Sequence, residues 1–228
     1  MGMQQSGADA QAKATKGKSW LKCRPVGIGS MAGQNTMHND AFQSLVETSD
    51  KWISKRTGIR NRHVIDKGST LRDIGVESAQ QALKSSGTDA KDIDLVIVAT
   101  STPDDLFGDA GAIAASIGAT NAAAFDLTAA CSGFVFGLVT ASQFLHSGAY
   151  KKVLVVGADA LTRFLNWEDR GTCILFGDGS GATVLEATDS EDDSGILGFA
   201  LHSDGSRAEN LRLPFNSDFR ELSNDDKS

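Results

Sequence analysis

One short segment restricts the fold of this chain more than any other: residues 93–100 read IDLVIVAT, an almost continuous β-branched run. Such a run is typical of a strand buried on both faces, as in a parallel sheet. Two more apolar segments follow at 122–127 and 153–156, and segments of helical length at 106–117 and 132–146 separate the three. Strands that alternate with helices predict βαβ units and a mostly parallel sheet, and therefore an α/β fold.

Helix and strand signals also precede this core. Residues 26–30 form a short apolar segment punctuated by glycines, which predicts a strand. Ser49 or Asp50 can cap a short helix. Apolar and small residues recur at helical spacing over 71–83, and Gly87 closes that helix.

The glycine-rich segment 177–181 lies between two short apolar segments, 174–176 and 182–185. This pattern predicts a hairpin at the edge of the sheet. The glycines are spaced G-x-G-x-G, late in the chain, and strand-like residues follow them. A dinucleotide-binding loop is therefore not expected, since its glycines open a helix.

The helix predicted over 132–146 has apolar residues on nearly all sides. A helix of this kind must be covered on most of its surface. In a two-layer α/β domain one side of it would face water. The sequence therefore predicts a further layer over this helix, from a second domain or a second chain.

Charge and residue usage exclude several classes of protein. The 228 residues carry a formal net charge of -7, which makes nucleic-acid binding a poor fit. The three cysteines are far apart, and neither they nor the four histidines show metal-ligand spacing, so no metal site is predicted and a reducing compartment is the simplest reading. No apolar run approaches the roughly 20 residues of a membrane-spanning helix.

Cys131 is the candidate nucleophile because it follows a predicted strand and opens a predicted helix. The positive end of a helix stabilises a thiolate, and its amides can donate to the oxyanion of an attacked thioester. A buried structural thiol is the alternative, which we favour for Cys23 and Cys173 because they lack this context.

A second candidate site is the basic, tryptophan-containing segment 48–62. Trp52 could stack on a base, and the arginines of this segment, Arg56, Arg60 and Arg62, could stack on it as well or hold phosphates. An ordinary charged surface helix is the alternative.

These elements occur together in one family. The segments concerned are TSDKWI (48–53), RTGIR (56–60), FDLTAACSGF (125–134), DRGT (169–172), FGDGSGA (176–182) and HSDGS (202–206). In order and spacing they resemble the signatures of ketoacyl-ACP synthase III, a family of thiolase-fold condensing enzymes that build 3-oxoacyl-[acyl-carrier-protein].

The resemblance implies two similar βαβαβαββ halves in five layers, usually in a homodimer, with this chain supplying the N-terminal half and the start of the second. Cys131 would take an acyl group from acyl-CoA, typically acetyl-CoA. Malonyl-ACP would then lose carbon dioxide and attack the acyl-enzyme. Coenzyme A enters as a thioester substrate and no cofactor is expected. Trp52 and Arg170 would sandwich its adenine, with Thr48 and Arg56 nearby, and Phe107 would border the acyl pocket of the partner subunit.

The resemblance also divides the chain. Residues 1–22 would be a disordered tail or the remnant of a transit peptide, which leaves plastid stroma or cytoplasm as the compartment. Residues 23–188 would form the thiolase-like half, and residues 195–228 would begin the next. The family's histidine and asparagine lie in that next half, so we expect an apparently truncated chain that is acylated but does not condense. Gly108 follows Phe107 where many members carry proline, which leaves the primer open.

Three alternatives remain. Another thiolase-fold condensing enzyme, chalcone-synthase-like or hydroxymethylglutaryl-CoA-synthase-like, would share the fold. A cysteine hydrolase would use the small residues around Cys131 as an elbow, with His146 or His202 as its base. A half without catalytic activity could bind coenzyme A or a partner chain.

Overall fold

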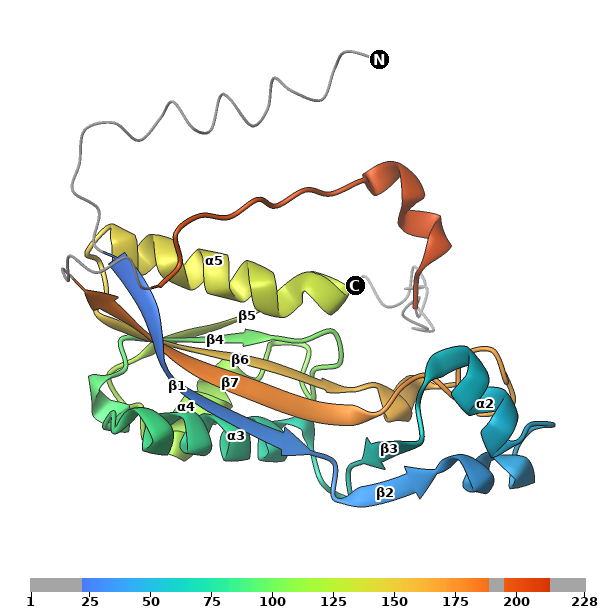
Figure 1. The fold of residues 1–228 in the computed structure, drawn as a ribbon. Helices are drawn as coiled ribbons and strands as arrows, with labels where there is room; N and C mark the ends of the chain where they lie inside the picture. The colour runs from blue at the N-terminus through green and yellow to red at the C-terminus, as the bar shows by residue number, and fades with distance from the viewer. Residues whose placement is uncertain (1–21, 189–194, 214–228) are drawn as a thin grey trace, which may run out of the picture.

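A computed structural model describes residues 22–188 and 195–213, and a five-stranded sheet forms their centre (Figure 1). The strand order is β1-β7-β6-β4-β5. The strands are β1 (Lys22–Ala32), β4 (Leu95–Ala99), β5 (Ala123–Leu127), β6 (Lys152–Ala160) and β7 (Asp178–Thr188). Strand β4 pairs in parallel with β5 and β6, whereas β7 is antiparallel to both of its neighbours, β6 and β1.

Helices cover both faces of the sheet (Figure 1). Helices α3 (Leu71–Ser86) and α4 (Ala110–Ile117) lie on one face and α5 (Gly133–His146) lies on the other. Successive strand side chains point to opposite faces. Val96 and Val98 of β4 therefore pack with α3 and α4, while its Leu95 and Ile97 pack with α5. This double burial explains the unbroken apolar run and confirms that prediction.

The core elements follow one another as β1-α3-β4-α4-β5-α5-β6-β7, which is the βαβαβαββ order expected. The helix predicted before this core begins at an N-cap: the Ser49 hydroxyl accepts from the Trp52 amide, and α2 spans Asp50–Thr57. Gly87 ends α3 as predicted. The short, polar strands β2 (Asn35–His38) and β3 (Asn61–Val64) form a separate small sheet that the sequence did not reveal.

Two predictions near the sheet were wrong. Residues 174–176 form no strand; Ile174 packs in a small core with Phe42, whereas Leu175 is 43% exposed. Gly179 and Gly181 lie inside β7, between β1 and β6, so no edge hairpin forms. Helix α4 begins at Ala110 instead of residue 106, because Gly108 takes a φ of 94° that a helix cannot include.

The ends of the chain are only partly covered. The predicted tail at 1–22 lies outside the described residues except for Lys22, and the acidic segment 189–194 lies outside them too. Residues 195–213 form no strand, and one 3-10 turn spans Gly205–Asn210 (Figure 1). Within this stretch Ile196 packs with the core on the α5 side of the sheet. That this stretch begins a second half stays a prediction, as does a further layer over α5, whose Val135 is 51% exposed. No helix in the described ranges is long and apolar enough to cross a membrane.

Close packing of α3 on β1 depends on Gly29. A Cβ atom there would lie 2.1 Å from the Ser78 carbonyl oxygen and 2.6 Å from the Ala82 amide nitrogen, so Gly29→Ala must push the helix away. We expect a loss of about 1–3 kcal/mol or more in the free energy of unfolding. In α4, Gly111 has nothing within 4 Å, so Gly111→Ala is the matched control and should be neutral or stabilising by up to about 1 kcal/mol. Urea unfolding followed by circular dichroism measures both, and equal midpoints for Gly29→Ala and the unmodified chain would contradict this packing.

Candidate active site

An open recess of about 390 Å³ lies where β4 and β6 end and β7 begins. Ligands of α/β proteins bind outside the carboxyl ends of parallel strands, so this is the expected place for a site. The lining includes Cys131, Phe134, Asp159 and several glycines of β6 and β7. The absence of side chains on those glycines leaves space in front of the thiol.

Cys131 lies in a 3-10 turn, Ala130–Ser132, that leads directly into α5. Its side chain is exposed in the recess at the positive end of that helix. The residue before it, Ala130, has a φ of 47°, the one positive φ of a non-glycine residue among those described. Strain of this kind persists where the surrounding structure holds it, and it is frequent at functional sites.

The other two thiols are buried. Burial raises the pKa of Cys23 to about 11. Burial, together with the nearby Asp169 carboxylate, also raises the pKa of Cys173. Both therefore stay protonated thiols at neutral pH, as the sequence context predicted.

Close approach of α5 to the sheet brings Cys131 to the strand ends. A Cβ atom on Gly157 of β6 would lie 3.0 Å from the Phe134 ring, so glycine lets the first turn of α5 lie directly on the strand. Any larger residue there would lift the start of the helix away from the recess.

Asp159 is a recess residue that the sequence reasoning missed. Its carboxylate accepts hydrogen bonds from the Ser101 amide at 2.9 Å and the Thr102 hydroxyl at 3.2 Å. It thereby fixes the turn after β4 at the rim of the recess. An acidic residue near the carboxyl end of a buried strand was the available signal.

The residues predicted to hold the adenine lie together around Trp52. The Arg56 guanidinium carbon lies 4.1 Å from the centre of its ring and that of Arg170 lies 4.7 Å from it. Arg170 also donates to the Glu47 carbonyl oxygen at 2.9 Å. The Thr48 hydroxyl is buried, and among the described residues no hydrogen-bond partner is found for it. Buried polar atoms are normally paired, but because this oxygen is covered, a ligand could reach it only if the side chains around it moved.

Positive charge accumulates at this cluster. Within the described ranges neither Arg56 nor Arg170 forms an ion pair, whereas Arg60 is paired with Asp50 at 3.2 Å. Two arginines on one aromatic ring without a carboxylate suit a ligand that carries both a base and phosphates.

The cluster lies toward the same end of the sheet as the recess. Helix α2, which carries Trp52, lies beyond the same end of the sheet as the start of α5 (Figure 1). Trp52 packs in a small apolar core with Cys173 and Ile174. From there the chain runs on to Gly177, which lines the recess.

Phe107 takes no part in this chain's own recess. Its side chain is fully exposed on the loop between β4 and α4. A role in the pocket of a partner subunit stays a prediction.

The positions of His146 and His202 do not support a cysteine hydrolase. His146 is at the last position of α5, a helix of 14 residues, which puts it roughly 20 Å along the axis from Cys131. Neither His146 nor His202 lines the recess. The described ranges also contain no group of three or more His, Cys, Asp or Glu placed to hold a metal ion.

Known proteins match both this fold and these segments. Residues 125–205 match the family model of 3-oxoacyl-[acyl-carrier-protein (ACP)] synthase III. The chain is 53% identical over 197 residues to the beta-ketoacyl-[acyl-carrier-protein] synthase III of Trichormus variabilis, covering 86% of this chain and 59% of that protein. The corresponding synthase of Acaryochloris marina is 51% identical over 197 residues, covering 86% of this chain and 58% of that protein.

Solved structures agree with the sequences. The 3-oxoacyl-[acyl-carrier-protein] synthase III of Aquifex aeolicus is 40% identical with a TM-score of 0.77, covering 81% of this chain and 59% of that one. The synthase of Pseudomonas aeruginosa is 38% identical with a TM-score of 0.81, covering 86% and 62%.

The fold is therefore that of the thiolase-like condensing enzymes. Within that class, the sequence and the structure of the chain are similar to those of the 3-oxoacyl-[acyl-carrier-protein] synthase III family. The chain spans about 59% of the length of the first curated relatives.

The different surroundings of the three thiols predict selective alkylation. At pH 8 iodoacetamide should modify Cys131 at least about tenfold faster than Cys23 or Cys173, because thiolates react and buried thiols with raised pKa values form few of them. Peptide mapping by mass spectrometry identifies the modified residue. Unfolding in guanidinium is the control, since it should make the three rates similar. Fast modification of Cys23 or Cys173 in the folded chain would contradict the assigned burial.

Proposed function

We propose that this chain captures an acyl group on Cys131 as the first step of a fatty-acid condensing reaction. The Cys131 sulfur attacks the thioester carbonyl of an acyl-CoA, acetyl-CoA in the first instance. The tetrahedral intermediate expels the coenzyme A thiolate and leaves a thioester on the enzyme. The observation that carries the proposal is the exposed thiol in the recess at the positive end of α5.

The start of α5 contributes the electrostatics of this step. Its dipole favours the thiolate before attack and the oxyanion that develops during attack. The glycines of the recess admit the substrate carbonyl. The strained Ala130 turn supports the proposal because it aims the thiol at the recess instead of the core.

We assign the nucleotide end of coenzyme A to the Trp52 cluster. A base stacked between Trp52 and Arg170 needs room for a further aromatic layer, which the present spacing of 4.7 Å does not provide. Arg170 must therefore move away from the ring when the base enters, and its bond to the Glu47 carbonyl oxygen breaks. Arg56 is the group placed for phosphate oxygens, and the Thr48 hydroxyl would bind a ribose oxygen only after the side chains that cover it move.

The complete reaction of the family would add malonyl-ACP, whose decarboxylation yields the carbanion that attacks the acyl-enzyme and forms a 3-ketoacyl-ACP. We assign only acyl capture to the residues described, because no histidine is among those that line the recess. Similarity to cyanobacterial synthases supports a place in fatty-acid synthesis, in plastid stroma or cytoplasm, over a chalcone-synthase-like or hydroxymethylglutaryl-CoA-synthase-like role.

Incubation with acetyl-CoA tests this function. Intact mass spectrometry should show one added acetyl group on the unmodified chain and none on Cys131→Ser. Cys173→Ser is the matched control and should be acetylated as before, since that thiol is buried. A folded chain that gains no acetyl group would contradict the proposal. An adduct that is rapidly lost to water would favour the hydrolase instead.

We also propose that the chain forms a homodimer through β5. This strand lies at one edge of the sheet, has β4 as its one partner among the strands of residues 22–188 and 195–213, and has exposed residues at Ala123, Ala124 and Phe125. An open strand edge is a template for pairing with another chain. At the opposite edge, the Ser85 hydroxyl already binds the amide and the carbonyl of Ile28 in β1, at 2.8 Å and 2.7 Å.

Lysine substitutions at the two edges of the sheet test which edge forms the dimer. Ala124→Lys should convert a dimer to a monomer in light scattering, because a charge on an edge strand opposes pairing. Ile28→Lys, on the blocked edge, should leave the mass unchanged. A monomeric unmodified chain, or loss of association in Ile28→Lys alone, would contradict pairing through β5.

A further inference from the structure

The Asp159 carboxylate lies near the carboxyl end of β6 and lines the same recess as Cys131. Neither the capture of the acyl group nor the binding of coenzyme A uses it. We propose that Asp159 is a positioning residue: it holds the turn after β4, and through that turn it keeps the Cys131 thiol aimed at the recess. The proposal rests on the acyl capture proposed above and adds a residue to the same site.

One oxygen of the Asp159 carboxylate anchors three consecutive residues after β4. Oδ1 accepts from the Ser101 amide at 2.9 Å, from the Thr102 hydroxyl at 3.2 Å and from the Thr100 hydroxyl at 3.4 Å. The Thr102 hydroxyl also accepts from the Ala160 amide at 2.8 Å, which ties the turn to the strand that carries Asp159. Hydrogen bonds to a carboxylate are stronger than neutral ones, so this oxygen fixes the turn against β6.

The turn after β4 contacts the segment that leads to Cys131. The Thr100 amide donates to the Leu127 carbonyl oxygen at 3.1 Å, which extends the pairing of β4 with β5 by one residue. The Ser101 and Thr128 hydroxyl oxygens lie 3.4 Å apart. Thr128 comes three residues before Cys131, so a displaced Ser101 removes a contact on the approach to the nucleophile.

The Cys131 turn needs support from outside because its backbone is strained and its side chains are exposed. Ala130 has a φ of 47°, and such strain persists only where the surrounding structure imposes it. Thr128, Ala130 and Cys131 are exposed, so little side-chain packing holds them. The hydrogen bond from the Ser132 amide to the Ala129 carbonyl oxygen lies within the turn itself. The turn after β4 therefore supplies a restraint that the Cys131 turn does not contain.

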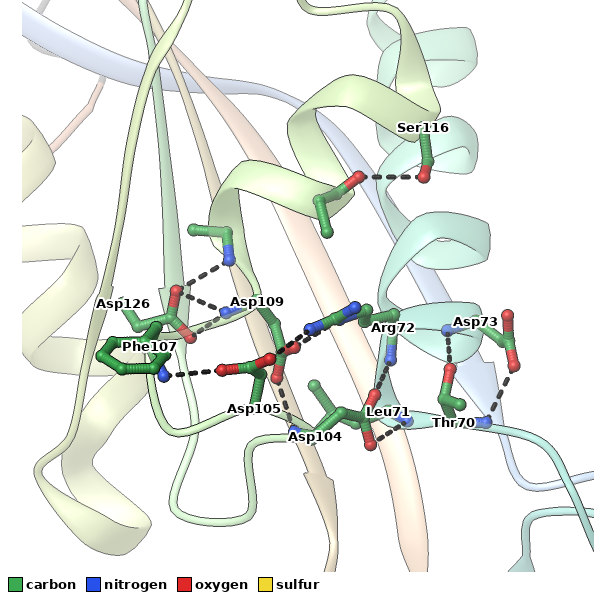
Figure 2. Close-up of polar contacts among 12 residues, drawn as sticks. Thr70, Leu71, Arg72, Asp73, Asp104, Asp105, Phe107, Asp109, Ser116 and Asp126 are labelled. Atoms are coloured by element: carbon green, nitrogen blue, oxygen red, sulfur yellow. Dashed lines mark hydrogen bonds and ion pairs between the residues drawn. The ribbon is translucent and has the colours of Figure 1, made fainter.

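A separate carboxylate network holds β5 and the neighbouring helices (Figure 2). Asp126 of β5 accepts from the Ala110 amide at the start of α4, at 2.7 Å. The buried Asp109 carboxylate accepts from the Arg72 guanidinium of α3 at 2.5 Å. Neither bond involves Asp159. Loss of the Asp159 carboxylate should therefore loosen the turn after β4 and the Cys131 turn while β5, α3 and α4 stay in place.

Acylation kinetics with acetyl-CoA test this inference. Asp159→Ala should lower the rate of Cys131 acylation at saturating acetyl-CoA by at least about tenfold, because a misplacement of about 1 Å can cost about a hundredfold in rate. The acetyl-CoA concentration that gives half the maximal rate should change by less than about twofold, since the Trp52 cluster is unaltered. Intact mass spectrometry at timed intervals measures both quantities.

Asp159→Asn separates positioning from charge. In the part of the chain that the structure describes, the hydrogen bonds to this carboxylate all reach Oδ1, so an amide nitrogen can replace Oδ2 while Oδ1 still accepts. Neutral bonds are weaker but are still formed, so Asp159→Asn should keep the acylation rate to within about threefold of the unmodified chain. A loss as large as that of Asp159→Ala would assign the effect to the charge and contradict positioning.

Asp94→Ala is the matched control. Asp94 directly precedes β4, and its carboxylate accepts from the Lys151 and Lys152 amides at 2.8 Å and 3.0 Å. It ties β4 to β6 as Asp159 does, but at the end of these strands away from the recess. Asp94→Ala should lower the urea midpoint, as Asp159→Ala does, and keep the acylation rate of the unmodified chain.

Thr128→Val acts on the other side of the contact. It removes the hydroxyl that meets Ser101 and keeps nearly the same side-chain shape. Acylation should slow by about threefold, and this loss should not add to that of Asp159→Ala, because both changes remove the same support. If Asp159→Ala does not fold, Thr128→Val decides the matter.

The outcomes separate the two proposals. An unmodified chain that takes no acyl group overturns the proposed function, and this inference with it. An unmodified chain that is acylated, together with Asp159→Ala and Thr128→Val variants that are acylated as fast, overturns this inference alone. Slowing by Asp94→Ala as large as that by Asp159→Ala would also overturn it, since a general loss of stability would then explain both.

Discussion

The buried carboxylate of Asp178 is the contact on which the candidate site depends. It is the first residue of β7, and it accepts hydrogen bonds from the Ile65 amide at 3.0 Å, the Thr162 amide at 2.9 Å and the Thr162 hydroxyl at 2.6 Å. These donors belong to the segments after β3 and after β6. Charge-assisted bonds of this kind are stronger than neutral ones. One side chain therefore joins the central sheet, which carries Cys131, to a smaller unit that consists of β2, β3 and α2 and carries Trp52.

A second buried ion orders that smaller unit. The Arg62 guanidinium donates to the Ile174 carbonyl oxygen and to the Asn39 side chain, and it stacks over the Phe42 ring at 4.6 Å. Burial lowers the pKa of this arginine. Asn39 in turn donates to Asp50 at the start of α2, at 2.8 Å. These polar contacts thus fix helix α2 and the position of Trp52. The ring of Trp52 takes no part in them, so Arg56, Arg170 or a ligand can stack on it.

Local patterns predicted the core and the nucleophile, while long-range contacts escaped them. The doubly buried β4, the Ser49 cap of α2 and the helix after Cys131 each follow from neighbouring residues and were predicted. The glycines of β7 were misread as a turn because they lie in a strand and line the recess in front of Cys131, a long-range arrangement that the local sequence does not reveal. The carboxylates of Asp109, Asp126 and Asp159 were missed because their partners lie elsewhere in the chain. Family resemblance, not periodicity, brought Trp52 and Arg170 together.

The central claim is that Cys131 and the Trp52 cluster form one site for a coenzyme A thioester. Protection of Cys131 from iodoacetamide by coenzyme A tests it most directly. Saturating coenzyme A should slow alkylation of Cys131 by about tenfold, and Trp52→Ala should raise the concentration that gives half protection by about tenfold, the loss expected for one stacking contact. Coenzyme A that binds without slowing alkylation, or that protects Trp52→Ala as well as the unmodified chain, would contradict a single site.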